Sequence, residues 1–378
     1  MKTIRFYSIL FSLTFICIVS SCKKNTKEKI NKTVTEKVVP ENLKWSERMV
    51  LSEIERFPDP TLLDFRKKPK WSYTPGLVLS ACAKVYEQTK NKKYYDYVYA
   101  YADQMIDSSG TIDTYKLSNQ NLDMIKSGDV LLYLYPKTKE ERFLIAMETL
   151  NGQLESQPKT SDGGYWHKKI YTNQMWLDGL YMAEPFHTRY AKEYINDKAK
   201  QQKIYNDVVH QFDLIQKHSR DQKTGLLYHG WDESKEQRWA NKETGNSANF
   251  WSRGMGWYGM ALVDVLDFLP ENHPRREKII RYLNQYSEAV VKVQDESGLW
   301  WQVLNQPNKK GNYLEATGTA MFVYTLAKGV NKGYLPKSYV NFANKGYDGL
   351  INNVITVEDN GIVNLNKCCG VAGLGGKP

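Results

Sequence analysis

The sequence predicts an all-α fold, an (α/α)6 toroid made of helical hairpins. Amphipathic helical patterns recur along almost the whole chain. A glycine-containing turn with a short β-prone segment follows every second pattern, and almost nothing competes as a long strand. Paired helices whose longer connections all emerge at one end describe a ring with a single loop-rich rim.

Eleven amphipathic patterns define the expected helices. In each of them apolar residues recur at the three- and four-residue spacing of one helix face. Their ranges are 44–56, 75–90, 92–107, 122–135, 138–154, 173–192, 196–218, 249–268, 273–294, 313–329 and 336–353.

The long connections share the glycine turn and the β-prone segment, at 109–112, 162–166, 224–228, 297–301 and 360–363. A looser sixth member spans 57–73, where prolines interrupt the helix. Only five helices follow these six loops, because the sequence ends in the glycine-rich segment 373–378. The toroid is therefore expected to lack its last helix.

The N-terminal residues have the composition of an export signal. Lys2 and Arg5 precede an apolar run at 6–19 that is short for a membrane span, and small residues then lead to Cys22. We expect residues 1–21 to be a lipoprotein signal peptide and Cys22 to be lipidated, with palmitate among its acyl chains. An ordinary signal peptide with an incidental cysteine is the alternative.

Residues 22–42 lack aromatic side chains and large apolar clusters, so we expect a flexible tether. Residues 43–378 then form one large domain, because no change of composition marks a second one. The protein is expected to be exported and lipid-anchored at the bacterial outer membrane, on its periplasmic or cell-surface face.

The formal net charge of +10 does not by itself indicate nucleic-acid binding. Many lysines lie in the signal, the tether and scattered loops, without a basic face or a nucleic-acid motif. No nucleic-acid partner is expected. A basic surface would still attract an acidic saccharide or an anionic membrane.

The segment 173–182 places Asp178 among aromatic and apolar neighbours near the start of a helical pattern. A carboxyl group held there should keep a proton that it can donate. The alternative is an aspartate that caps its helix. We favour catalysis, because the helical pattern already includes residues 175–177 and leaves the cap position near Thr172 or Asn173.

Other chemically interesting residues fall on the same rim of the expected ring. Asp123 opens the helix after the second long loop, and Asp178 opens the helix after the third. Arg253 and Trp257 follow the fourth loop, which contains His229. Residues far apart in the sequence are therefore expected to face a common cavity.

Six segments in a fixed order carry a family resemblance: 71–77 (Trp-Ser-Tyr-Thr-Pro-Gly-Leu), 121–125 (Asn-Leu-Asp-Met-Ile), 173–182 around Asp178, 229–232 (His-Gly-Trp-Asp), 251–257 around Arg253, and 370–375 (Gly-Val-Ala-Gly-Leu-Gly). In them the chain resembles the unsaturated rhamnogalacturonyl hydrolases, glycoside hydrolase family 105, and more distantly the unsaturated glucuronyl hydrolases of family 88. The likeness runs from about Leu43 to the end. Single segments are weak signals, but their order and spacing together are specific.

The resemblance implies an enzyme that acts after a polysaccharide lyase. The lyase supplies the substrate and need not bind this protein. The lyase leaves a uronic acid with a C4=C5 double bond at the non-reducing end. An acid then protonates C4, water adds at C5, and the resulting hemiketal opens and expels the neighbouring sugar. Pectic rhamnogalacturonan and the sulfated algal polysaccharide ulvan are both sources of substrate within this family.

The resemblance assigns the role of acid to Asp178 and that of a second, substrate-binding carboxylate to Asp123. For Asp123, a helix cap after Asn121 is the alternative. Arg253 is expected to hold the uronate carboxylate through two parallel hydrogen bonds, and Trp257, one turn later, to stack on the sugar ring. A structural ion pair and a core tryptophan are the alternatives for these two.

Histidine and aromatic side chains complete the expected site. His229 and His167 are candidates for contacts to sugar hydroxyls or to the carboxylate, and each is otherwise a loop histidine bonded to backbone. Trp176, Trp231 and Tyr73 are candidates for the aromatic lining, with the hydrophobic core as the alternative. No cofactor and no metal are expected, because hydration of a vinyl ether needs only a proton and water.

The leading hypothesis is a lipid-anchored glycosidase that releases a Δ4,5-unsaturated uronic acid from rhamnose in lyase products. A uronate lyase or a sugar epimerase on the same fold is one alternative. A non-catalytic surface lipoprotein that captures oligosaccharides is another.

Overall fold

The computed structural model describes residues 38–374, and all statements on structure refer to this part of the chain. The predicted signal peptide, the lipidation site Cys22 and most of the predicted tether lie outside it. The predicted start of the domain at 43 is too late. Val39 is fully buried, and its N–H group donates to the Asn360 carbonyl, so residues 38–42 belong to the folded unit.

The described residues contain eleven α-helices, one for each predicted pattern. They are α1 (Trp45–Arg56), α2 (Tyr73–Thr89), α3 (Lys92–Met105), α4 (Gly128–Thr138), α5 (Glu141–Ser156), α6 (Leu177–Tyr194), α7 (Lys198–Ser219), α8 (Ser252–Val265), α9 (Arg276–Val291), α10 (Ala316–Asn331) and α11 (Tyr339–Asn353).

The strands are short, as the sequence predicted, but the first of them pairs with a strand more than fifty residues away. Three antiparallel two-stranded ladders join β1 (Gln174–Trp176) to β2 (Gly230–Asp232), β3 (Trp300–Trp301) to β4 (Leu314–Glu315), and β5 (Ile355–Val357) to β6 (Val363–Leu365). Three one-turn 3-10 helices lie in loops: η1 (Pro60–Leu62), η2 (Leu117–Asn119) and η3 (Leu122–Met124).

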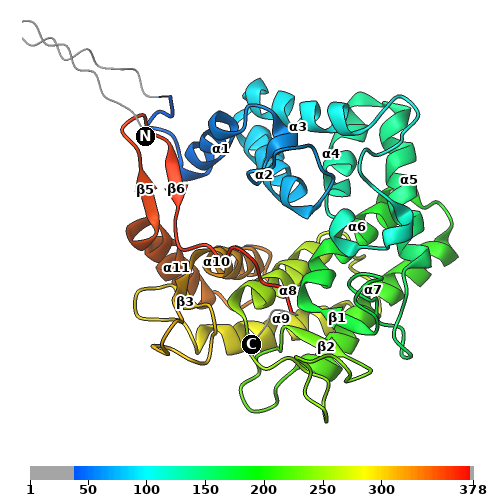
Figure 1. The fold of residues 1–378 in the computed structure, drawn as a ribbon, viewed down its shortest axis with the longest axis vertical. Helices are drawn as coiled ribbons and strands as arrows, with labels where there is room; N and C mark the ends of the chain where they lie inside the picture. The colour runs from blue at the N-terminus through cyan, green and yellow to red at the C-terminus, as the bar shows by residue number, and fades with distance from the viewer. Residues whose placement is uncertain (1–37, 375–378) are drawn as a thin grey trace, which may run out of the picture. The chain divides into compact units, whose positions relative to one another are not determined.

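The even-numbered helices form the inner layer of the ring. Successive members pack side by side, α2 on α4, α4 on α6, α6 on α8 and α8 on α10. The odd-numbered helices lie outside them (Figure 1). Burial follows this division, because α6 and α8 bury residues around most of their circumference whereas α9 buries one face.

The long loops run from odd- to even-numbered helices, so they all meet at the N-terminal ends of the inner helices. Each glycine of the predicted repeat adopts a positive φ: Gly110 (83°), Gly163 (97°), Gly225 (75°), Gly298 (86°) and Gly361 (90°). Glycine tolerates this conformation without steric penalty, which explains why the turn recurs in the sequence. The predicted helical toroid with a loop-rich rim is confirmed, and no twelfth helix lies within residues 38–374.

The described cysteines, Cys82, Cys368 and Cys369, are free thiols, and Cys82 is fully buried. None of the described helices combines the length and the apolar composition that a membrane crossing requires.

Candidate active site

The segment that precedes Asp178 is a strand, not part of the helix. Strand β1 pairs with β2, so that Trp176 lies opposite Gly230. Helix α6 begins only at Leu177, and Trp176 occupies the cap position without a side-chain cap hydrogen bond. The predicted cap near residues 172–173 is therefore wrong, because pairing with a distant strand overrides the local helical pattern. Asp178 still lies in the first turn of the helix and does not cap it.

The same strand pair brings His229 to Asp178. The Leu177 N–H group donates to the His229 carbonyl at 3.0 Å, and His229 Nδ1 lies 3.5 Å from Asp178 Oδ2. The ring fits because residue 254 is glycine, where a Cβ atom would lie 2.2 Å from His229 Nδ1. Burial lowers the pKa of His229, although the nearby Asp178 opposes this shift. A neutral imidazole therefore faces the carboxyl group.

Asp178 is neither turned out to solvent nor sealed off. Its side chain is 14% exposed, so a ligand can reach it. Its Oδ2 atom is buried and has no hydrogen-bond partner among the described residues. A buried polar atom without a partner costs free energy and is uncommon in folded proteins. Within residues 38–374, His229 Nδ1 is the one basic side-chain atom within ion-pair distance of this oxygen, and the exposed part of the carboxyl group is the part that a substrate can reach.

Asp123 lies beside this carboxyl group but has a different environment. It belongs to η3, before α4 rather than in its first turn, and its N–H group donates to Asn121 Oδ1 at 3.0 Å. Asn121 is thus the cap, not Asp123. His167 Nε2 lies 3.2 Å from Asp123 Oδ1, and Lys168 Nζ lies 2.6 Å from Oδ2.

These two partners fix the charge of Asp123. Burial alone would raise the pKa of its carboxyl group, but His167 and Lys168 outweigh burial and hold the pKa well below the usual range. Asp123 is therefore a carboxylate. Among the described residues, neutral His229 is the one basic side chain within ion-pair distance of Asp178, so no cation pairs with Asp178.

Arg253 lies in the first turn of α8 and supplies a cation to the site. Its guanidinium donates to the Tyr73 hydroxyl at 3.2 Å and to the Cys369 carbonyl. The Cys369 N–H group in turn donates to Glu315, which caps α10. These hydrogen bonds hold the loop around Cys369 against the starts of α8 and α10. Within residues 38–374 Arg253 has no carboxylate partner, which leaves its charge free for a substrate carboxylate.

The residues of the site, those predicted and those found in the structure, divide into two groups by burial. The half-buried side chains that a ligand can reach are Tyr73, Asp123, Lys168, Tyr171, Asp178, Trp251 and Arg253. The buried ones, exposed by at most 6%, are His167, Trp176, His229, Trp231 and Trp257. The side chains of the second group are too buried to contact a ligand directly.

Trp257 does not offer the predicted stacking face. It is 2% exposed, with Tyr181 stacked on it at 5.1 Å and Tyr73 packed edge-on at 6.1 Å. The prediction of a sugar-stacking Trp257 is therefore wrong, because α6 and α2 cover the indole. Its role here is to support Tyr73.

Trp231 does not join the site either. Side chains alternate between the faces of a strand, and Trp231 lies on the face of β2 that stacks on His218, with ring centroids 3.7 Å apart. Its Nε1 donates to the Thr244 carbonyl. The predicted contact of Trp231 with substrate is wrong for this reason.

Trp176 holds a histidine in place. His167 and Tyr171 both stack on its indole, at 4.9 Å and 4.8 Å. His167 also fits closely against α6, because a Cβ at Gly179 would lie 3.3 Å from its Nδ1. His167 and His229 therefore each contact an aspartate, His167 at Asp123 and His229 at Asp178.

Lys168, Tyr171 and Trp251 were missed by the sequence analysis. Trp251 packs on His229 at 4.6 Å, and Lys168 neutralises Asp123. Lys168 is brought there by an isolated bridge between Asn121 and Lys168, a tertiary contact that no local pattern announces.

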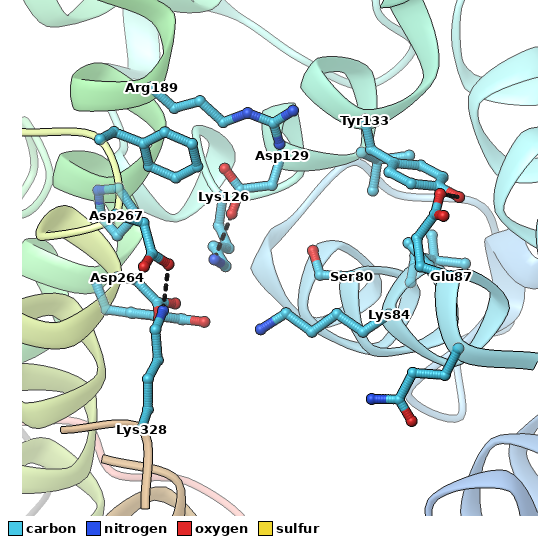
Figure 2. A pocket seen from close by; sticks show the side chains of 17 residues that line it. Ser80, Lys84, Glu87, Lys126, Asp129, Tyr133, Arg189, Asp264, Asp267 and Lys328 are labelled. Carbon is cyan, nitrogen blue, oxygen red and sulfur yellow. Dashed lines mark hydrogen bonds and ion pairs between the residues drawn. The ribbon is translucent and has the colours of Figure 1, made fainter. Parts of the chain in front are cut away.

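A cavity of about 450 Å³ lies among the inner helices, and it is lined by Asp264 and Lys328 near the C-terminal ends of α8 and α10. Figure 2 shows the side chains that line it. Most of its charges are paired: Lys328 Nζ is 2.6 Å from Asp264 Oδ1 and also bonds Asp267, and Lys126 bonds Asp129. Lys84 donates instead to the Tyr324 hydroxyl. Tyr181 separates this cavity from the site, since it lines the cavity and stacks on Trp257.

A model of Glycosyl Hydrolase Family 88 matches residues 45–377, nearly the whole described part and every residue of the site. The chain belongs to this family. It is therefore a glycoside hydrolase, as predicted.

The relatives agree with this assignment. The solved structure of a Clostridium acetobutylicum glycoside hydrolase from family 105 is 46% identical, with a TM-score of 0.83 over 89% of this chain and 90% of that one. The "Unsaturated rhamnogalacturonyl hydrolase YesR" of Bacillus subtilis is 26% identical over 309 residues, 78% of this chain and 80% of the relative. Protein Atu3128 of Agrobacterium fabrum is 36% identical over 159 residues, 40% of this chain and 66% of its own length. The predicted family resemblance is confirmed.

Proposed function

We propose that this family 88 hydrolase releases a Δ4,5-unsaturated uronic acid from the non-reducing end of rhamnose-containing lyase products. The observation that carries the proposal is the Asp178 carboxyl group, partly exposed at the rim with a buried Oδ2 that has no partner. The name of the Bacillus subtilis relative supports the substrate class.

Asp178 acts first as an acid and then as a base in this proposal. Its carboxyl proton goes to C4 of the vinyl ether, which leaves positive charge at C5 and the ring oxygen. Water then forms a bond to C5 and gives its proton to the Asp178 carboxylate. The hemiketal opens by cleavage of the bond from C5 to the ring oxygen, and C1 expels the neighbouring sugar. The position of Asp178 in the first turn of α6 favours the carboxylate that forms when the proton leaves.

The other rim residues orient the substrate. Arg253 can hold the uronate carboxylate through a planar pair of N–H groups, and Tyr73 fixes the guanidinium on one side. Asp123 is held ionised by Lys168 and His167 and accepts hydrogen bonds from sugar hydroxyls. Neutral His229 keeps Asp178 in place without adding a positive charge next to the acid.

An absorbance assay across a panel of lyase products tests the proposal. The C4=C5 double bond absorbs ultraviolet light, so the hydrolase should remove the absorbance of unsaturated rhamnogalacturonan or ulvan disaccharides. A rise in absorbance would instead identify a uronate lyase, and conversion without a change would identify an epimerase. Binding of the disaccharides without turnover would identify an oligosaccharide-capture protein. The panel also distinguishes pectic from sulfated substrates.

We propose further that the protein is exported and anchored by lipid at Cys22 to the outer membrane, where it meets oligosaccharides made by a lyase. The proposal is supported by the basic N-terminus, the short apolar run at 6–19 and the small residues before Cys22. Labelling with a palmitate analogue in the native host tests it. Cys22→Ala should abolish the label and shift the protein from the membrane fraction to the soluble fraction.

A further inference from the structure

A separate cavity of about 870 Å³ lies between α5, α6 and α7, and none of the site residues lines it. Its walls come from Leu154 and Glu155 of α5, His187 of α6 and one face of α7. Lys159, Tyr165 and Arg275 complete the rim. A cavity of this size accommodates one or two sugar rings.

His187 lines this cavity with both ring nitrogens free. The side chain is 3% exposed, and neither Nδ1 nor Nε2 has a hydrogen-bond partner among the described residues. Burial lowers the pKa of His187 to about 4, so the imidazole is neutral. A neutral imidazole offers one N–H donor and one nitrogen acceptor, which together complement a hydroxyl group.

The rim carries an excess of positive charge. Four cations, Lys159, Lys200, Lys203 and Arg275, face two carboxylates, Glu155 and Asp207. Lys159 pairs with Asp207 at 3.2 Å, Lys200 pairs with Glu155 at 2.8 Å, and Arg275 bonds Asp213 outside the cavity. Lys203 has no hydrogen bond or ion pair within residues 38–374.

The start of α7 does not itself supply a binding site. Asp197 already accepts hydrogen bonds from the Ala199 and Lys200 N–H groups. Recognition in this cavity therefore depends on side chains. The free cation of Lys203 suits an acidic group, and the free imidazole of His187 suits a hydroxyl.

We propose that this cavity is a second saccharide site, which binds an acidic mono- or disaccharide away from the Asp178 site. Lys203 contacts the carboxylate or sulfate group, and His187 contacts a ring hydroxyl. The site needs no double bond in its ligand, so it is independent of the chemistry proposed for Asp178.

Calorimetric titration with digalacturonic acid, a saturated acidic disaccharide, tests this site in the full folded domain. Lys203→Glu should weaken the binding at least tenfold and leave kcat and KM for hydrolysis of unsaturated substrates unchanged. Lys337→Glu is the matched control, because Lys337 is also exposed and lies outside the cavity. Maltose, a neutral disaccharide, should bind at least tenfold more weakly than digalacturonic acid.

His187→Phe separates a binding role from a structural one. It removes two unpartnered nitrogens and keeps a flat apolar ring, so the melting temperature should stay the same or rise while digalacturonic acid binding falls. The proposal is overturned if no saturable binding occurs, if Lys203→Glu and wild type bind alike, or if maltose binds as tightly. A His187→Phe variant that binds normally also overturns it. These readouts do not depend on turnover, so a failure of the proposed hydrolysis leaves them interpretable.

Discussion

The two ends of the inner helices contain carboxylates of equal burial in opposite states of pairing. The side chains of Asp178 at the N-terminal end and of Asp264 at the C-terminal end are both 14% exposed. Lys328 lies 2.6 Å from Asp264, whereas Asp178 Oδ2 has only the neutral His229 beside it. Burial alone therefore does not distinguish the reactive acid from the structural one. The absence of a paired cation beside Asp178 does distinguish it.

The helix dipole acts in opposite directions at these two positions. Asp264 lies in the last turn of α8, where the dipole disfavours a carboxylate, and Lys328 offsets this cost. Asp178 lies in the first turn of α6, where the dipole favours the carboxylate that forms after proton transfer. At the end that contains Asp264 the carboxylate is neutralised by Lys328, which stabilises the fold. At the end that contains Asp178 the carboxyl group has no paired cation and remains able to interact with a substrate.

The largest effect is expected for Asp178→Asn. The amide cannot donate a carboxyl proton, so kcat should fall by about 10²–10⁴-fold, the usual contribution of general acid catalysis. The melting temperature should not fall, since Oδ2 makes no hydrogen bond that the variant could lose. Asp348→Asn, an exposed change of the same kind on α11, is the control and should keep full activity.

Asp123→Asn tests the paired carboxylate at the active end. It should lower the free energy of unfolding by about 2–3 kcal/mol at pH 7, less than for a fully buried pair because Asp123 remains 15% exposed. In wild type the folded state depresses the pKa of Asp123. The ionised carboxylate therefore contributes fully to the free energy of unfolding above the pKa of the unfolded chain, about 4, and this contribution is lost as the pH falls below that value. Urea denaturation at pH 7 and pH 3 should show a smaller pH dependence for the variant. Equal pH dependence in both proteins would show that Lys168 and His167 do not stabilise the carboxylate.

Arg253→Lys should reduce kcat/KM by about 10–100-fold, because an ammonium group cannot form two parallel hydrogen bonds to a carboxylate. Most of the loss should appear in KM. Steady-state kinetics measures it, with Arg281→Lys at an exposed position as the matched control. An unchanged KM would remove Arg253 from substrate binding.

The smallest effect, on stability alone, is expected at the other end of the helices. Lys328→Met leaves Asp264 and Asp267 without their shared cation and should cost about 1–2 kcal/mol, reduced from the buried-pair value by the open cavity. Activity should stay within about twofold of wild type. A large loss of kcat in a folded Lys328→Met protein would mean that the two ends are coupled through Tyr181 and Trp257.

The fold followed from the sequence because its signals are local. The eleven helical patterns and the repeated glycine turns depend on spacing and backbone conformation, and both agree with the structure. The start of α6 was wrong by several residues because β1 owes its extended form to β2, more than fifty positions away in the chain.

The site followed from the sequence only in part. The positions of Asp178, Asp123 and Arg253 at the starts of inner segments could be predicted from the loop repeat. The sequence could not predict which aromatic rings are exposed. The burial of Trp257 and Trp231 depends on Tyr181 and His218, which contact them only through tertiary packing. Lys168 was missed for the same reason.

The central claim is that Asp178 delivers a proton to C4 of an unsaturated uronic acid. The most direct measurement is NMR of the released product after the reaction of an unsaturated rhamnogalacturonan disaccharide in D2O. With wild type we expect loss of the C4=C5 double bond and one deuterium at C4, and with Asp178→Asn neither change. Release of rhamnose with the double bond intact would contradict this claim.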